Sequence, residues 1–175
     1  MGGFPCRGGR FRVRWEVAGV RQNGGDGSGS VRKVSLMQGW MPPSFSYRTF
    51  VAFFGDLAGR GALPARFDLS AVAEYPPSIG PQLLELMERM GLLDADGAVV
   101  GESMRAVVGG EARWREFLTG WAREVYAEQL GLAAAGAGEE ELRASFARFG
   151  YKPHKLPRAV QFFHALRADL GLVGT

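Results

Sequence analysis

The chain has 175 residues, 46% of them hydrophobic, which is enough to bury the core of one domain or of two small ones. It contains no uninterrupted apolar run of about 18 residues, so a membrane-spanning helix is excluded, and its start lacks the apolar core of a secretory signal. A single cysteine, Cys6, cannot form an internal disulfide, so we expect a cytoplasmic protein.

The net charge of +3 is unevenly distributed. Residues 1–35 hold seven Lys and Arg against two acidic side chains, whereas residues 36–175 hold 14 basic against 16 acidic ones. The main part of the chain is therefore mildly acidic, and net charge alone does not indicate nucleic-acid binding. The excess of Arg over Lys, with many Gly and Ala, is typical of a GC-rich genome.

Residues 1–36 are predicted to form a flexible Gly- and Arg-rich extension, with a Gly/Ser linker at 23–30. Apolar and charged residues alternate at 11–17, as in a strand with one buried face. Two interpretations are open: an edge strand, or upstream sequence if translation starts at Met37 or Met41. We favour the second because no partner strand is evident.

The composition of the sequence changes at Pro42, after which aromatic and aliphatic residues are frequent. Ser44 or Ser46 caps the first predicted helix, which ends near Gly59 and Gly61. Its apolar stripe follows helical spacing and consists of Phe50, Phe54 and Leu57.

A winged helix-turn-helix outline follows between Asp68 and Gly101. Asp68 caps a short helix through Ala73, and a second helix begins at Ser78 or Gly80 and ends at Gly91. The tip Asp94-Ala-Asp-Gly97 separates two short predicted strands, at 92–93 and 98–100, which form the candidate wing. We assign residues 37–105 to this winged-helix-like module.

Residues 106–175 are predicted to form a helical module packed on the first. One helix is expected from Glu111 to Leu130, with Gly120 as a weak point. Another runs from Glu139 to Gly150, and the last, from Pro157 to Leu170, follows a basic loop at 151–155. The predicted fold class is mainly α with a small β-hairpin.

Residues 45–172 resemble the bacterial domain-of-unknown-function family numbered 5343. The matching pieces are Leu63-Pro64, Asp68-Leu69-Ser70, Gln82-Leu83-Leu84, Met90-Gly91-Leu92-Leu93, Asp96-Gly97, Arg113 with Tyr126, Ala159-Val160-Gln161-Phe162-Phe163 and Gly171. The resemblance implies a compact, mostly helical, winged-helix-like body. It brings no catalytic residues and no established activity.

No catalytic or metal-binding pattern stands out. Cys6 has no histidine near it in sequence, and His154 and His164 lack a carboxylate or cysteine at ligand spacing. The Gly-rich run at 25–29 lacks the Lys-Ser/Thr ending of a phosphate loop. We therefore predict no enzyme activity, no metal and no cofactor.

One set of cations indicates recognition of nucleic acid. It lies on a helix, a loop and a second helix, which is how a helix-turn-helix approaches phosphate. The candidate DNA-binding residues are Arg143, Arg148, Lys152, Lys155 and Arg158, with His154 and Arg167 nearby. A solvated helix face has the same sequence pattern.

The predicted wing helix favours a protein partner instead. Its outer face carries Gln82, Glu85 and Arg89, and Asp94 and Asp96 place carboxylates at the wing tip, where they would repel phosphate. Two hypotheses are thus open: a regulatory or defence-related DNA-binding module, or a protein-interaction or scaffolding domain.

Overall fold

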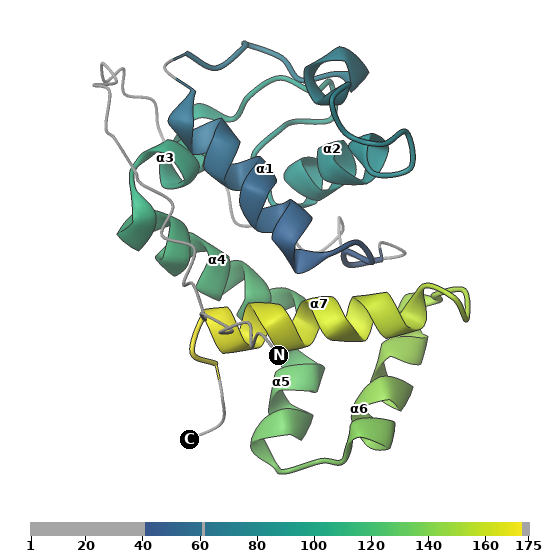
Figure 1. Cartoon of the computed structure of the whole chain (residues 1–175). Coiled ribbons are helices and arrows are strands. Elements are labelled where there is room, and N and C mark those ends of the chain that lie inside the picture. The colour runs from purple at the N-terminus through teal and green to yellow at the C-terminus, as the bar shows by residue number, and fades with distance from the viewer. Residues whose placement is uncertain (1–40, 61, 173–175) are drawn as a thin grey trace, which may run out of the picture.

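A computed structural model describes residues 41–60 and 62–172, and within these ranges the protein is all-α, with seven α-helices and two short 3-10 helices (Figure 1). The helices are α1 (Tyr47–Gly59), η2 (Leu69–Val72), α2 (Gly80–Arg89), α3 (Gly101–Val108), α4 (Glu111–Val125), α5 (Ala127–Ala134), α6 (Glu139–Ser145), η3 (Phe146–Phe149) and α7 (Leu156–Asp169). The predicted strand at 11–17, the linker at 23–30 and Cys6 lie outside the described residues.

Helix α1 begins where its cap residue predicts. The Ser46 side chain accepts a hydrogen bond from the Thr49 backbone N–H at 3.1 Å, which satisfies one of the free donors of the first turn. The predicted stripe is buried, together with one further aromatic side chain: Phe50, Phe53, Phe54 and Leu57. The first predicted helix is confirmed.

The next two elements also follow their local signals. Asp68 caps η2 by accepting from the Ser70 N–H at 2.8 Å. Helix α2 has Pro81 in its first turn, where a missing N–H costs little, and it buries Leu83, Leu86 and Met87.

The predicted wing differs from expectation, because no β-strand forms within the described residues. The turn itself is present: the Asp94 N–H donates to Ala98 O and the Val100 N–H to Leu92 O, both at 2.9 Å. The pairing is limited to the isolated bridge Leu93–Val99, because α2 ends just before it and α3 begins at residue 101. A second bridge joins Ala98 to Arg66.

Helix α3 is an element that the sequence analysis did not predict. It buries Met104 and Val107, but its cap residue, Val100, makes no side-chain capping bond, so no start signal precedes it. It also contains residue 105, where we predicted the boundary between two modules. That division stays a prediction.

The single helix predicted from 111 to 130 is wrong in one respect, because it is divided into α4 and α5 at Tyr126. The break does not fall at Gly120, which is exposed within α4. Tyr126 departs from helical backbone geometry, with φ −108° and ψ 27°, while its ring is fully buried. The expected apolar stripe is buried as predicted: Trp114, Leu118, Trp121 and Val125.

Helix α7 crosses the middle of the molecule, with α1 on one side and the α5–α6 pair on the other (Figure 1). Phe162 packs edge-to-face against Phe50 of α1, with ring centroids 5.4 Å apart. Phe163 contacts Tyr126 at 5.1 Å and Phe146 at 5.7 Å. These aromatic contacts hold the middle of α7 against α1 on one side and against Tyr126 and η3 on the other.

Candidate nucleic-acid interface

Three of the predicted cations surround the start of α7. Lys152 and Arg158 are exposed, Lys155 is half-buried, and the Lys155 N–H donates to Lys152 O at 2.8 Å in a tight turn that leads into the helix. None of the three forms an ion pair within residues 41–60 and 62–172. The structure thus brings together Lys152, Lys155 and Arg158, which we call the α7 basic cluster.

The charged side chains near this cluster in the sequence are all positive. Between Glu141 and Asp169 the sequence contains six Lys and Arg residues and no Asp or Glu. The first turn of α7 has no acidic residue, and the free N–H groups of a helix start add a partial positive charge. An anion approaching this turn meets attraction from both side chains and backbone.

Arg148, predicted to bind DNA, is engaged inside the protein instead. Its guanidinium pairs with Glu128 at 2.5 Å and donates to the Val125 carbonyl at 3.4 Å. It also lies 4.7 Å from the centre of the Phe149 ring. Arg148 therefore ties η3 to the α4–α5 junction, and the nearby buried Gln129 extends this link by donating to Ser145 O at 3.2 Å.

Arg143 also has an internal partner. It pairs with Glu139 one turn earlier on α6 at 3.9 Å, and the same carboxylate contacts His164 of α7 at 3.1 Å. Because this pair is solvent-exposed, its stabilisation is small and its guanidinium is only partly neutralised. Of the five predicted DNA-binding residues, the three in the α7 basic cluster are without such a partner in the described chain.

The residues predicted to bind a protein partner lie on α2 but are unequally accessible. Glu85 is exposed, whereas Gln82 and Arg89 are half-buried. The Gln82 side chain folds back and donates to Ser78 O in the turn before the helix. The predicted surface is thus centred on Glu85.

One of the two acidic side chains at the wing tip, Asp94, stabilises the turn itself. One Asp94 carboxylate oxygen accepts from the N–H groups of Asp96 at 2.9 Å and Ala98 at 2.8 Å, which holds the turn closed. The Arg66 guanidinium donates to the Asp96 backbone carbonyl, so a positive charge lies next to the tip. This contact is not predictable from local sequence, because the two residues are 30 positions apart.

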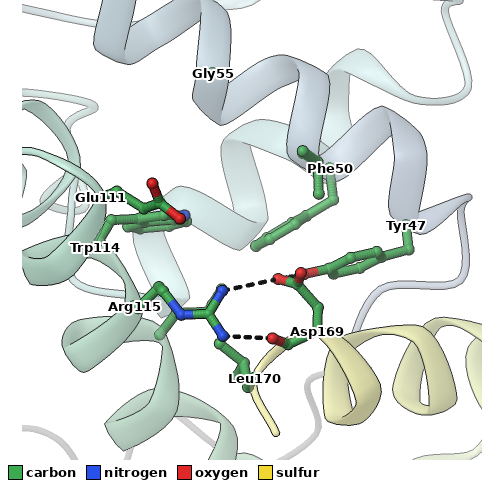
Figure 2. A pocket seen from close by; sticks show the side chains of 10 residues that line it. Tyr47, Phe50, Gly55, Glu111, Trp114, Arg115, Asp169 and Leu170 are labelled. Carbon is green, nitrogen blue, oxygen red and sulfur yellow. Dashed lines mark hydrogen bonds and ion pairs between the residues drawn. The ribbon is translucent and has the colours of Figure 1, made fainter. Parts of the chain in front are cut away.

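A small pocket of about 90 Å³ lies between α1, α4 and the end of α7 (Figure 2). Figure 2 shows Arg115 and Tyr47 both directed at Asp169. The Tyr47 hydroxyl donates to the Asp169 carboxylate at 2.8 Å, and Arg115 donates to the Asp169 carbonyl. Burial, with help from the Asp169 hydrogen bond, raises the pKa of Tyr47 well above its usual value, so it stays a neutral donor.

These polar groups of the pocket bind one another. Arg115 offsets the charge of a carboxylate at the C-terminal end of α7, where the helix dipole disfavours negative charge, and the Tyr47 hydroxyl donates a hydrogen bond to it. A ligand would have to replace these contacts. We therefore interpret the pocket as a junction that fixes the end of α7, and sequence reasoning missed it because its parts are far apart in the chain.

Within the ranges that the structure describes, no group of three His, Cys, Asp or Glu side chains is placed to hold a metal ion. None of the helices described there combines the length and apolar character needed to cross a bilayer. Comparison with known protein families finds no match, and comparisons with curated proteins and solved structures find no similar protein. The resemblance to family 5343 therefore stays a prediction.

Proposed function

We propose that this protein is a non-catalytic, cytoplasmic bacterial module that binds nucleic acid through the α7 basic cluster, with a regulatory or defence-related role. In this proposal the segment from α1 to the turn at 94–97 is a reduced winged helix-turn-helix whose wing consists of isolated bridges. It acts as a scaffold, and the contact with phosphate is made by the C-terminal half.

One observation carries the proposal: Lys152, Lys155 and Arg158 gather at a helix start without any ion pair in the described chain. Here the surrounding sequence has no carboxylate for 27 residues, although residues 36–175 as a whole carry more acidic than basic groups. A polyanion is the partner that such an arrangement favours.

The acidic groups of the winged segment support this choice of surface. Glu85 is exposed on α2, and Asp94 and Asp96 are exposed at the turn. Inserting α2 into a DNA groove would bring these carboxylates towards phosphate, and the repulsion would oppose binding. We therefore assign the contact to α7 and leave α2 outside it.

The test is binding of the full chain to random-sequence duplex DNA over a salt series. Each phosphate contact contributes about 0.9 to the slope of log K against log salt, so the variant Lys152→Gln/Lys155→Gln/Arg158→Gln should lower the slope by about 2.7. The control Arg105→Gln/Arg113→Gln/Arg123→Gln changes the net charge equally, with three exposed cations of α3 and α4. It should leave the slope nearly unchanged.

Equal slopes for the wild type and the α7 variant would overturn the proposal. So would equal losses in both variants, because that result would reflect net charge rather than a site. Circular dichroism of each variant checks that the helices persist.

Leu69 favours a second candidate function, a protein-interaction or scaffolding domain. Leu69 is 61% exposed on η2, which packs against α2, the helix that carries Glu85. For this candidate, a protein recovered with the wild type should be lost with Leu69→Ser and retained by the α7 variant. Retention by both variants would reject this surface.

A further inference from the structure

The outward side of α7 carries few polar groups. The exposed residues of this helix are Pro157, Arg158, Gln161, Ala168 and Asp169. Proline and alanine side chains have no polar group, an arginine can only donate hydrogen bonds, and a carboxylate can only accept them. A glutamine amide does both. Gln161 is therefore the one exposed side chain of α7 that can pair with a donor and an acceptor at the same time.

The backbone at Gln161 is held in place by its neighbours. Phe162 and Phe163 are buried, and their rings lie 5.4 Å from that of Phe50 and 5.1 Å from that of Tyr126, respectively. With 3.6 residues per turn, burial of these two side chains leaves Gln161 on the solvent side of the helix. Its amide has no hydrogen bond to another residue of the described chain. A fixed backbone with a free amide is preorganised for an external partner.

Gln161 lies next to the α7 basic cluster. It follows Arg158 by three residues, so the two side chains are neighbours on the helix surface, about 4.5 Å apart along the axis. Base pairs of duplex DNA are roughly 3.4 Å apart, and the major groove of B-form DNA admits an α-helix. Figure 1 shows the first turn of α7 and the loop before it at one edge of the molecule. With the cluster on the phosphates at the groove wall, Gln161 comes level with the edge of a nearby base pair.

We propose that the first two turns of α7 enter the major groove of B-form duplex DNA and that Gln161 reads one A·T pair there. This inference rests on the proposed function and names the residue that gives its site a sequence preference. Adenine presents an acceptor at N7 and a donor at N6 in the major groove, and a glutamine amide pairs with both. The duplex has to be DNA, because the major groove of an A-form RNA helix is too narrow for side chains to read.

Carboxylates limit the contact to the first two turns. Glu139 of α6 lies beside the third turn, where it contacts His164 at 3.1 Å, and Arg143 offsets part of its charge. Asp169 ends the helix. Both carboxylates would repel phosphate that extended further along α7. The first turn has no acidic residue, so readout is confined to the few base pairs that the start of the helix reaches.

The first experiment selects duplexes from a random-sequence DNA library with the full chain and measures affinity for the enriched duplex. We expect one position to require A·T. Replacing that pair with G·C should weaken binding by about 5- to 150-fold, the range that one bidentate base contact gives. Duplex RNA of the same sequence should show no such difference, and a difference of that size would overturn the inference. A library with no enriched base would also overturn it and leave the proposed function standing, because phosphate contacts need no sequence preference.

Variants of Gln161 then test the base contact itself. Gln161→Ala should bind the enriched duplex and its G·C counterpart equally, with the salt slope of the wild type, because no charge is removed. Gln161→Arg should prefer G·C at the same position, since an arginine pairs with O6 and N7 of guanine. Gln82→Ala on α2 is the matched control and should keep the A·T preference. A changed preference in the control would assign the reading to α2, and an unchanged preference in both Gln161 variants would show that the amide does not touch the base; either result overturns the inference.

The α7 variant, Lys152→Gln/Lys155→Gln/Arg158→Gln, separates this inference from the proposed function. At low salt, where its binding is measurable, it should lose affinity for the enriched duplex and for the G·C counterpart by the same factor. The ratio of the two affinities is then kept. No loss with either duplex would overturn the proposed function, whereas loss of the ratio would assign the base contact to the cluster and overturn the role of Gln161. Circular dichroism of each variant checks that the helices persist.

Discussion

Tyr47 and Asp169 join the two ends of the described fold: the first residue of α1 donates its hydroxyl to the carboxylate of the last residue of α7 at 2.8 Å. Arg115 of α4 reaches the same carboxylate at 3.9 Å. Three helices that are distant in sequence therefore meet at one negative charge. The contact joins the last turn of α7 to α1 and α4.

Replacing Tyr47 with Phe should destabilise the protein modestly. The ring contacts with Phe50 and Phe162 are kept, so the change removes only the hydrogen bond, and we expect the free energy of unfolding to fall by about 1 kcal/mol. Urea unfolding measures this difference. In a double-mutant cycle with Asp169→Ala, the two losses should not add, whereas full additivity would mean that the pair does not interact in solution.

Substitutions of Arg148 and Arg143 should differ in their effects on stability, although the sequence pattern assigned both residues to the same DNA-binding surface. Arg148 has three side-chain or carbonyl partners, Glu128, Val125 and Gln129, and a ring contact, so Arg148→Ala should cost about 1–2 kcal/mol. Arg143 forms one exposed pair along its own helix, and Arg143→Ala should cost at most about 0.5 kcal/mol. Thermal unfolding of the two variants distinguishes these outcomes. Equal losses would contradict the structural role assigned to Arg148.

Substitution of Gly97 tests the wing turn, and the same substitution at Gly120 of α4 serves as its control. Gly97 has φ +78°, and a Cβ built there would lie 2.7 Å from the Phe67 carbonyl oxygen, so Gly97→Ala should destabilise by about 2 kcal/mol or more. Gly120 lies within α4 with nothing near its Cβ position, and Gly120→Ala should stabilise by about 0.5–1 kcal/mol. Chemical denaturation of both variants tests the pair. A neutral Gly97→Ala would mean that the turn is not fixed as described.

Local signals accounted for the helix starts that the sequence analysis placed correctly. Ser46 and Asp68 each bind an N–H of the turn that follows, so their effect is readable from a few neighbouring residues. Helix α3 has no such cap, and short apolar runs next to a turn resemble a strand as much as a helix. The sequence therefore predicted a strand ending at Val100 where a helix begins.

In the candidate site, too, some features are predictable from neighbouring residues and others depend on tertiary contacts. The composition around α7 identified the cations, because a long stretch without carboxylates is visible in the sequence. It did not distinguish Arg148 from Lys152, because Glu128 and Val125, which engage Arg148, are 20 and 23 residues away. Which cations are available to a ligand is decided by tertiary packing.

Tyr126 gives a prediction of the opposite sign, a stabilising substitution. Its hydroxyl is buried and finds no hydrogen-bond partner among residues 41–60 and 62–172, while its ring packs between Trp121, Phe146 and Phe163. Removing an unsatisfied buried hydroxyl removes its desolvation penalty, so Tyr126→Phe should raise the free energy of unfolding at neutral pH by about 1 kcal/mol. A loss of stability would mean that the hydroxyl is bonded in solution.

The same residue should make stability depend on alkaline pH. Burial, with a smaller contribution from the nearby Tyr151, raises the pKa of Tyr126 well above its usual value of 10.0, so the native state keeps this proton after the unfolded chain has lost it. The native state then binds more protons than the unfolded state. The free energy of unfolding consequently falls as pH rises above about 10, by about 1.4 kcal/mol per pH unit for one tyrosine, and its contribution is fully present below that pH. Tyr126→Phe should reduce this slope by that amount in urea titrations between about pH 10 and 11.5. The decline due to Tyr47, Tyr75 and Tyr151 should remain, because burial also raises the pKa values of these residues. An unchanged slope would indicate that Tyr126 ionises in the folded protein and is less buried than the structure describes.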